Sequence, residues 1–186
     1  NPRHEAAVLN ARIRSRWLES EDVEISHIGE EFDSTFKLES YGQTAADLQK
    51  ALSGKLGKKL ESAKKPLIIV GSGIWENEDS AAVDSILKNF VKGKENIVNS
   101  EWNGVNFLHR QASRAGALDI GFYNSDPAVK TITPKVIFLY GADDVDPKSI
   151  PKDAFVVYIG HHGDLGASLA DVVLPSTAYT EKSAIY

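Results

Sequence analysis

Short apolar runs that stop at a glycine or a proline dominate the pattern of this chain. Each run is too short for a helix and is rich in β-branched and aromatic residues, which is typical of a strand buried on both faces of a parallel sheet. Four runs follow this pattern, at residues 67–70, 136–140, 155–159 and 172–174. The first three end at a glycine, and the fourth ends at Pro175, which cannot donate to a ladder in a central strand.

Apolar residues at three- and four-residue spacing predict helices between these runs. Helices are expected from Asn1 through Trp17, from Thr44 to Leu52, from about Ser80 to Val91 and from about Gly104 to Leu118. Asn1 and Pro2 suit the first helix as N-cap and first helical residue. Thr44 and Asp47 have the spacing of a capping box. Weaker strands are expected at 23–29 and at 96–98, the second as the return strand of the unit that begins at 67–70.

Strands that alternate with helices predict an α/β fold with a doubly wound, mostly parallel sheet and helices on both of its faces. Residues 1–186 are then expected to belong to one such domain. The loop-rich connection from Glu30 to Gly42 and the lysine-rich link through Lys65 leave open that residues 30–65 are only loosely attached.

Composition narrows the classes of function. The chain has 186 residues, 42% of them hydrophobic, which is enough for a substantial core. A net charge of −5 argues against a nucleic-acid partner, and no apolar stretch reaches the roughly 20 residues that cross a bilayer. Cysteine is absent, so this chain supplies no disulfide, no thiolate-held iron–sulfur cluster and no cysteine nucleophile. The chain has no methionine and starts at Asn1, which suggests a piece of a longer protein.

Charges are grouped in blocks. Arg3, Arg12, Arg14 and Arg16 surround the first helix, as a solvated face or as a site for a phosphate or an acidic partner. Residues 19–47 then carry nine Asp or Glu against one Lys, and lysines accumulate from Lys50 to Lys65. The sequence leaves open whether the acidic and basic blocks pair with each other or with neighbouring subunits.

Two loops carry weak candidates for a ligand site. Gly71-x-Gly73 begins like a dinucleotide fingerprint, but Glu76 stands where the third glycine belongs, so a tight turn is favoured. His161 and His162, with Asp164, offer metal-ligand types without a recognisable third or fourth ligand, so a hydrogen-bonded structural loop is favoured.

Two other patterns predict neither a metal site nor a catalytic site. Asp143, Asp144 and Asp146 resemble half a calcium loop, but the glycine and the distal glutamate of that loop are missing, so a solvated acidic turn is favoured. The serines are not in a nucleophile elbow. The sequence therefore assigns no catalytic residue and no metal ligand.

Three segments resemble a known family: NPRHEAAVLNARIR (1–14), LHRQASRAGALDIGF (108–122) and HHGDLGASLADVVLPSTAYTEKSAIY (161–186). They are similar to the 75 kDa subunits of respiratory complex I (NADH:ubiquinone oxidoreductase), in the part after the iron–sulfur clusters that is like molybdopterin oxidoreductases. The motif ADVVLP recurs across molybdopterin-dependent enzymes, and AYTEKSA after it indicates the complex I subunit.

The resemblance implies a place in the peripheral arm of complex I, on the matrix side of the mitochondrial inner membrane or on the cytoplasmic side in a bacterium. Other peripheral-arm subunits would be the partners, and the charge blocks of this fragment would dock them. The clusters that pass electrons from NADH toward ubiquinone would lie in the amino-terminal part of the subunit. This fragment would then hold no cofactor and act as a redox-silent scaffold.

Two alternatives remain from other classes. In relatives that use molybdopterin, the segment equivalent to Ala170–Pro175 lies near the cofactor, so the fragment could keep a pterin or nucleotide in the loops after its strands. A free-standing metal module on His161, His162 and Asp164 is the other. The resemblance also implies a strand before Asn1 and further structure after Tyr186, so an isolated fragment is expected to expose a sheet edge that invites aggregation.

Overall fold

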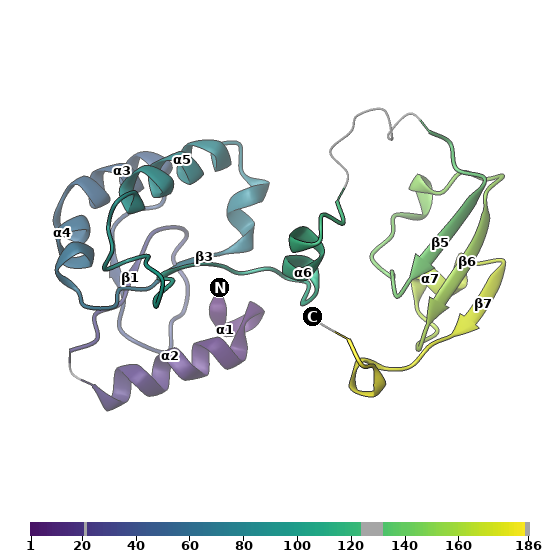
Figure 1. The fold of residues 1–186 in the computed structure, drawn as a ribbon, viewed down its shortest axis with the longest axis horizontal. Coiled ribbons are helices and arrows are strands. Elements are labelled where there is room, and N and C mark those ends of the chain that lie inside the picture. The colour runs from purple at the N-terminus through teal and green to yellow at the C-terminus, as the bar shows by residue number, and fades with distance from the viewer. Residues whose placement is uncertain (21, 124–131, 185–186) are drawn as a thin grey trace. The chain divides into compact units, whose positions relative to one another are not determined.

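The chain folds into two compact units, Asn1–Gln111 and Ala112–Tyr186, in a computed structural model that describes residues 1–20, 22–123 and 132–184 (Figure 1). All strand pairs within its sheets are parallel, and helices accompany them, which confirms the α/β class. The hydrogen-bonded strands of the described residues form sheets of two, two and three strands. The run at 67–70 lies in the first unit and the run at 136–140 in the second.

The first unit opens with two helices in place of the one expected. Helix α1 (Pro2–Glu5) and helix α2 (Ala7–Glu19) are separated at Ala6, whose φ of −144° and ψ of 58° are not helical. The expected cap is confirmed, because the side chain of Asn1 accepts a hydrogen bond from the backbone N–H of Arg3 at 3.0 Å.

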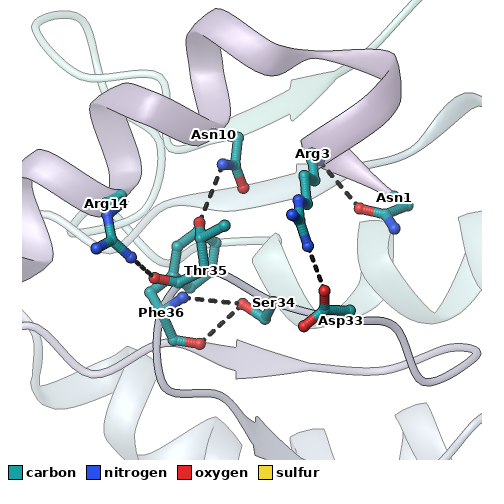
Figure 2. A network of polar contacts seen from close by, with 8 residues as sticks. All are labelled: Asn1, Arg3, Asn10, Arg14, Asp33, Ser34, Thr35 and Phe36. Atoms are coloured by element: carbon teal, nitrogen blue, oxygen red, sulfur yellow. Dashed lines mark hydrogen bonds and ion pairs between the residues drawn. The ribbon is translucent and has the colours of Figure 1, made fainter.

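Polar side chains fasten these helices to residues 33–36 (Figure 2). The guanidinium of Arg3 pairs with Asp33, and that of Arg14 donates to the backbone oxygen of Thr35. Asn10, which is buried on α2, donates to the hydroxyl of Thr35 at 3.0 Å. Two of the four arginines thus serve contacts inside the unit.

Helix α3 (Ala45–Ser53) begins at the predicted capping box, in which Thr44 and Asp47 satisfy each other's backbone N–H groups. The lysine-rich link predicted after it is wrong, since residues Lys55–Ser62 form helix α4. The two helices meet at Gly57, where a Cβ atom would lie 1.8 Å from the backbone oxygen of Leu52. Apolar side chains of α3, α4, α5 and β3 form the core of the unit: Ala51, Leu52, Leu56, Val70, Val83 and Leu87.

The acidic and lysine-rich blocks pair with each other at the short strands β1 (Ser26–His27) and β2 (Glu39–Ser40). Lys59 of α4 contacts both Glu24 and Glu39, and Lys55 lies 2.8 Å from Glu39. Hydrogen bonds from Lys55 and then Lys59 lower the pKa of Glu39 to about 2. Hydrogen bonds to the carboxylates of Glu24 and Glu39 raise the pKa of Lys59.

Helix α5 (Ser80–Val91) is confirmed, and Gly93 after it takes the positive φ of 75° that a C′ glycine provides. The strand beside β3 (Ile68–Val70) differs from the one expected. It is β4 (Val105–Phe107), within the stretch predicted as a helix, and that helix is reduced to α6 (Arg114–Asp119). Residues 96–98 form no strand and make one antiparallel bridge, Val98 to Asn103.

Close packing at Gly104 explains why a strand, and not a helix, follows it. A Cβ atom on Gly104 would lie 2.5 Å from the backbone oxygens of both Ile97 and Pro66, so only glycine fits there. The oxygen of Gly104 accepts from Ile68 N–H at 2.7 Å, which begins the pairing of β3 with β4. Ile97 is fully buried beside it. These contacts join residues far apart in sequence and override the helical pattern.

The second unit contains α6 and one sheet in the order β5 (Val136–Tyr140), β6 (Phe155–Gly160), β7 (Val172–Pro175). Pro175 lies on an edge strand, where the missing donor is tolerated. Side chains of Ile137, Leu139, Val156 and Tyr158 point to one face, which we call the covered face. The connections between the strands pack on it, including helix α7 (Leu165–Ser168), drawn behind the sheet in Figure 1.

The other face, which we call the open face, is apolar, and its residues on the two edge strands are exposed, whereas Val157 on the central strand is buried. Strand alternation and the pairing register place eight residues on it: Val136, Phe138, Tyr140, Phe155, Val157, Ile159, Val172 and Leu174. Phe138 and Tyr140 are each 67% exposed. The prediction that 136–140 and 172–174 are buried on both faces is therefore wrong for these two strands among the described residues.

We expect the ion-pair cluster at Glu39 to make the chain acid-sensitive. The folded-state pKa of about 2 lies below the ordinary value of 4.5, so the stabilisation is present above about pH 4.5 and is lost as the pH falls toward 2. Urea denaturation at pH 6, 4, 3 and 2.5 should show the unfolding free energy falling less in Glu39→Gln than in the parent. Glu95→Gln, whose carboxylate makes no ion pair among the described residues, is the control and should follow the parent.

Candidate functional site

Parallel α/β sheets bind ligands in the loops that follow their strands, which makes these loops the candidate site in each unit. In the first unit, Gly71 and Gly73 follow β3 and lead into the 3-10 helix η1 (Ser72–Glu76). Gly71 has an ordinary φ of −73°, and a Cβ atom on either glycine would meet nothing within 4 Å. Neither glycine is required by the turn itself, and both border open space.

The surroundings of this turn are aromatic and acidic. The rings of Trp75 and Phe107 lie 5.7 Å apart at an angle of 36°. Glu76 lies 3.7 Å from Arg110, whose guanidinium also lies 3.6 Å from Glu5. The arginine beside this turn is thus shared between two carboxylates.

The histidines after β6 are exposed and pack on each other. The rings of His161 and His162 are 4.5 Å apart at 78°, an edge-to-face contact. Asp164 precedes α7 and makes no side-chain cap hydrogen bond. Among the residues that the structure describes, no three His, Cys, Asp or Glu side chains are grouped so as to hold a metal ion.

The most constrained side chain at this end of the second unit is Tyr158, which the sequence pattern marked only as part of a strand. It is 1% exposed, and its hydroxyl donates to Asp143 at 3.0 Å. The other oxygen of Asp143 accepts from the backbone N–H of Gly166 at 3.0 Å. Burial of the ring and the hydrogen bond to Asp143 raise the pKa of the tyrosine.

The interpretation of Asp143 as part of a solvated acidic turn is therefore wrong, because its carboxylate joins β6 to α7. Of its two acidic neighbours, Asp144 is not buried, and Asp146 caps the 3-10 helix η3 (Pro147–Ser149) by accepting from Lys148 N–H. The three aspartates thus have different roles.

Two glycines make room for the tyrosine. A Cβ atom on Gly160 would lie 2.3 Å from the Tyr158 hydroxyl oxygen. One on Gly166 would lie 2.7 Å from the Tyr158 ring and 2.4 Å from the backbone oxygen of Ala142. The ring therefore fills the space between β6 and α7. An aromatic residue followed two positions later by a strand-ending glycine is the sequence signal that could have indicated this packing.

These loops do not fit a pterin or nucleotide ligand, whose phosphates need N–H donors and cations. The loop at 71–79 carries Glu76, Glu78 and Asp79 and no Lys or Arg. The loop at 141–148 carries three aspartates against Lys148, and the first of them is already bonded to Tyr158. The loop at 160–164 adds His161, His162 and Asp164.

We expect Gly166→Ala to destabilise the chain by about 3 kcal/mol, the upper end of overpacking, because the new methyl group would meet backbone and a buried ring. The matched control is Gly163→Ala, whose Cβ meets nothing within 4 Å and should stay within about 0.5 kcal/mol of the parent. Urea denaturation of both variants tests this. Helix propensity alone would make Gly166→Ala stabilising, so equal or higher stability would contradict the packing described.

The comparisons with known proteins agree along the whole chain. The chain is 57% identical over 187 residues to the mitochondrial NADH-ubiquinone oxidoreductase 78 kDa subunit of Candida albicans, and 53% identical over 187 residues to that of Neurospora crassa. It is 41% identical over 188 residues to a subunit of the NADH-quinone oxidoreductase of Rickettsia bellii. Each alignment covers 100% of this chain and 25%, 25% and 27% of the relative, so the chain spans about a quarter of their length.

The resemblance found in the sequence is confirmed by these relatives. The sequence profile described as "Molybdopterin oxidoreductase" matches residues 1–186. A match over every residue shows that this chain belongs to the molybdopterin oxidoreductase family.

Proposed function

We propose that the chain is a non-catalytic scaffold region of the large iron–sulfur subunit of a respiratory NADH–ubiquinone oxidoreductase, complex I. The 57% identity over the whole chain to a subunit of the NADH-ubiquinone oxidoreductase supports the assignment to this enzyme. The observation that carries the scaffold role is the Tyr158 ring, which fills the space between β6 and α7 with the chain's own side chain.

The proposal places electron transfer outside residues 1–186. A relative from Solanum tuberosum, 40% identical over 192 residues, is named as an iron-sulfur protein. Thiolate-held clusters need cysteines, and this chain has none. The clusters of the proposed subunit are therefore held by cysteines outside residues 1–186. The chain's contribution is then to keep a rigid body in place beside them.

The proposed location follows the relatives' names. Three of them are described as mitochondrial, and one is from a bacterium. No helix in the described part of the chain combines the length and the apolar character that a membrane span requires. The proposed place is the peripheral arm of complex I, on the matrix side of the inner membrane or on the cytoplasmic side in bacteria.

The outer side of α2 is the proposed docking surface for an acidic neighbouring subunit. Arg3 and Arg14 are used inside the unit, whereas Arg12 and Arg16 are exposed and have no ion pair among the described residues. They are four residues apart and share one side of the helix with Val8, which is 76% exposed. A cationic stripe beside an apolar side chain suits a partner that presents carboxylates around an apolar contact.

Substitutions of the candidate loop residues distinguish a scaffold function from a ligand-binding function. We expect the variants Gly71→Ala with Gly73→Ala, and His161→Ala with His162→Ala, to leave NADH–ubiquinone turnover per assembled complex within about twofold of the parent, since these loops hold no cofactor. The measurement is turnover normalised to the iron–sulfur signals of the purified complex. A loss of turnover of about 10-fold or more at unchanged assembly would support a retained ligand and overturn the scaffold proposal.

The docking surface predicts a salt-dependent assembly. Exposed charges are screened beyond about 8–10 Å at ordinary ionic strength, so the parent's association with neighbouring subunits should weaken as salt rises. Arg12→Glu with Arg16→Glu should weaken association at low salt by about 10-fold or more, measured as copurification with the tagged full-length subunit. Lys92→Glu with Lys58→Glu is the control of equal charge change. Equal effects of both pairs, or retention that does not depend on salt, would remove this role from α2.

A further inference from the structure

Asn103 and Gly104, directly before β4, are the only Asn-Gly pair in the sequence. Asparagine is a thermolabile residue, and a following glycine makes it most prone to deamidation, because no side chain hinders attack by the glycine nitrogen on the asparagine amide. Gly104 cannot be exchanged for another residue, since a Cβ atom there would lie 2.5 Å from two backbone oxygens. The packing of the first unit therefore keeps a chemically labile pair beside β4.

Hydrogen bonds restrain both reacting groups in the folded unit. The backbone N–H of Gly104 is buried and donates to the oxygen of Ile97 at 2.7 Å. The side-chain oxygen of Asn103 accepts from the backbone N–H of Val105 at 3.2 Å. For deamidation, the glycine nitrogen must lose its proton to base, and the asparagine amide must turn toward it. Both changes break these hydrogen bonds, so the reaction requires local opening, as hydrogen exchange does.

Asn99 fixes the turn that leads to the labile pair. Its side-chain oxygen accepts from the backbone N–H groups of Glu101 and Trp102 at 2.7 and 2.8 Å. Beyond this turn, Asn103 lies opposite Val98 in the antiparallel bridge. Removal of the Asn99 side chain would therefore loosen the segment without changing either reacting residue.

We propose that Asn103 is a deamidation site that is closed while β3 and β4 are paired, and that isoaspartate at this position prevents the pair from forming again. In the opened chain, the deprotonated nitrogen of Gly104 forms a bond to the side-chain carbonyl carbon of Asn103, and the side-chain nitrogen leaves as ammonia. Water then opens the resulting succinimide ring, which gives aspartate or isoaspartate.

The two products differ in what the fold can accommodate. Aspartate keeps the ordinary backbone and a side-chain oxygen that can accept from Val105 N–H. In isoaspartate the backbone runs through the side chain and is longer by one methylene group. Gly104 then has to move, although it is closely packed between the oxygens of Ile97 and Pro66 and its own oxygen accepts from Ile68. A chain that spends time open therefore acquires a lesion that the folded unit does not accept.

The first test compares the native full-length protein with the same protein unfolded in urea, at the same neutral pH and temperature. Trypsin releases peptide 95–110, in which Asn96, Asn99 and Asn106 serve as internal references, and mass spectrometry locates the change. Asn103 should deamidate before these three in urea, and at least about 10-fold more slowly in the native protein than in urea. Equal rates in both states, or an unreactive Asn103 in urea, would overturn the inference.

The variant Asn99→Ala tests the control by the folded segment. It should raise the native rate at Asn103 about 10-fold and leave the rate in urea unchanged, because only the opening equilibrium differs. The matched control is Asn89→Ala, whose amide makes a 3.5 Å hydrogen bond within α5 and should keep the parent's native rate. If Asn99→Ala does not accumulate, Trp102→Phe replaces it, since it removes the 3.1 Å hydrogen bond to the Pro66 oxygen. An unchanged native rate in this variant would contradict the proposal.

Limited proteolysis of partly deamidated native protein tests the effect of isoaspartate. The aspartate form has the same mass and is the matched control, and an isoaspartyl methyltransferase with a labelled methyl donor distinguishes the two. Isoaspartate at position 103 should be lost from the resistant fraction at least about 10-fold faster than aspartate. Equal retention of both forms would overturn the claim that isoaspartate prevents pairing. All of these reactions take place within the first unit, so the results do not depend on assembly with other subunits.

Discussion

Parallel pairing is the constraint on which the second unit depends. A parallel strand cannot be joined to its neighbour by a tight turn, so the chain must return across the sheet after every strand, and it does so with one hand. In the β5–β6–β7 sheet this requirement gathers both connections on the covered face and leaves Phe138 and Tyr140 exposed on the other. The asymmetry of the sheet is thus a result of topology, since both faces are apolar in sequence.

The Tyr158 ring, which packs on the covered face, also occupies space at the carboxyl end of β6, the end at which parallel sheets hold ligands. Tyr158 leans along the face toward the strand ends, and Gly160 and Gly166 lack the Cβ atoms that would block it. Its hydroxyl would be costly to bury alone, and Asp143 satisfies it while also accepting from Gly166. A buried donor, a shared carboxylate and two glycines form one arrangement, and an incoming phosphate would have to replace all of it beside further aspartates.

Local rules explain what the sequence predicted well. The capping box of Thr44 and Asp47, the C′ glycine at Gly93 and helix α5 depend on residues within a few positions of each other. The short apolar runs predicted strands correctly for the same reason. A run does not encode which strand pairs with it, and the strand beside β3 was therefore predicted at 96–98 instead of at β4. Strand β4 and the role of Asp143 depend on contacts across 36 and 15 to 23 positions, as between Ile68 and Gly104, so no local pattern marks them.

Some of the charged residues in the sequence are not available to partners, because they pair with each other inside the first unit. The acidic block at 19–47 and the lysine-rich block look like two docking surfaces, yet Lys55 and Lys59 pair with Glu24 and Glu39 within the unit. Exposed pairs of this kind add little stability, but each removes a charge from the field that a partner meets. The proposed docking surface therefore uses cations that have no ion pair among the described residues, Arg12 and Arg16. In the folded unit, Arg3 and Arg14 are engaged by Asp33 and Thr35. Arg12 and Arg16 are not engaged in this way, so a partner that binds these two arginines recognises the folded unit.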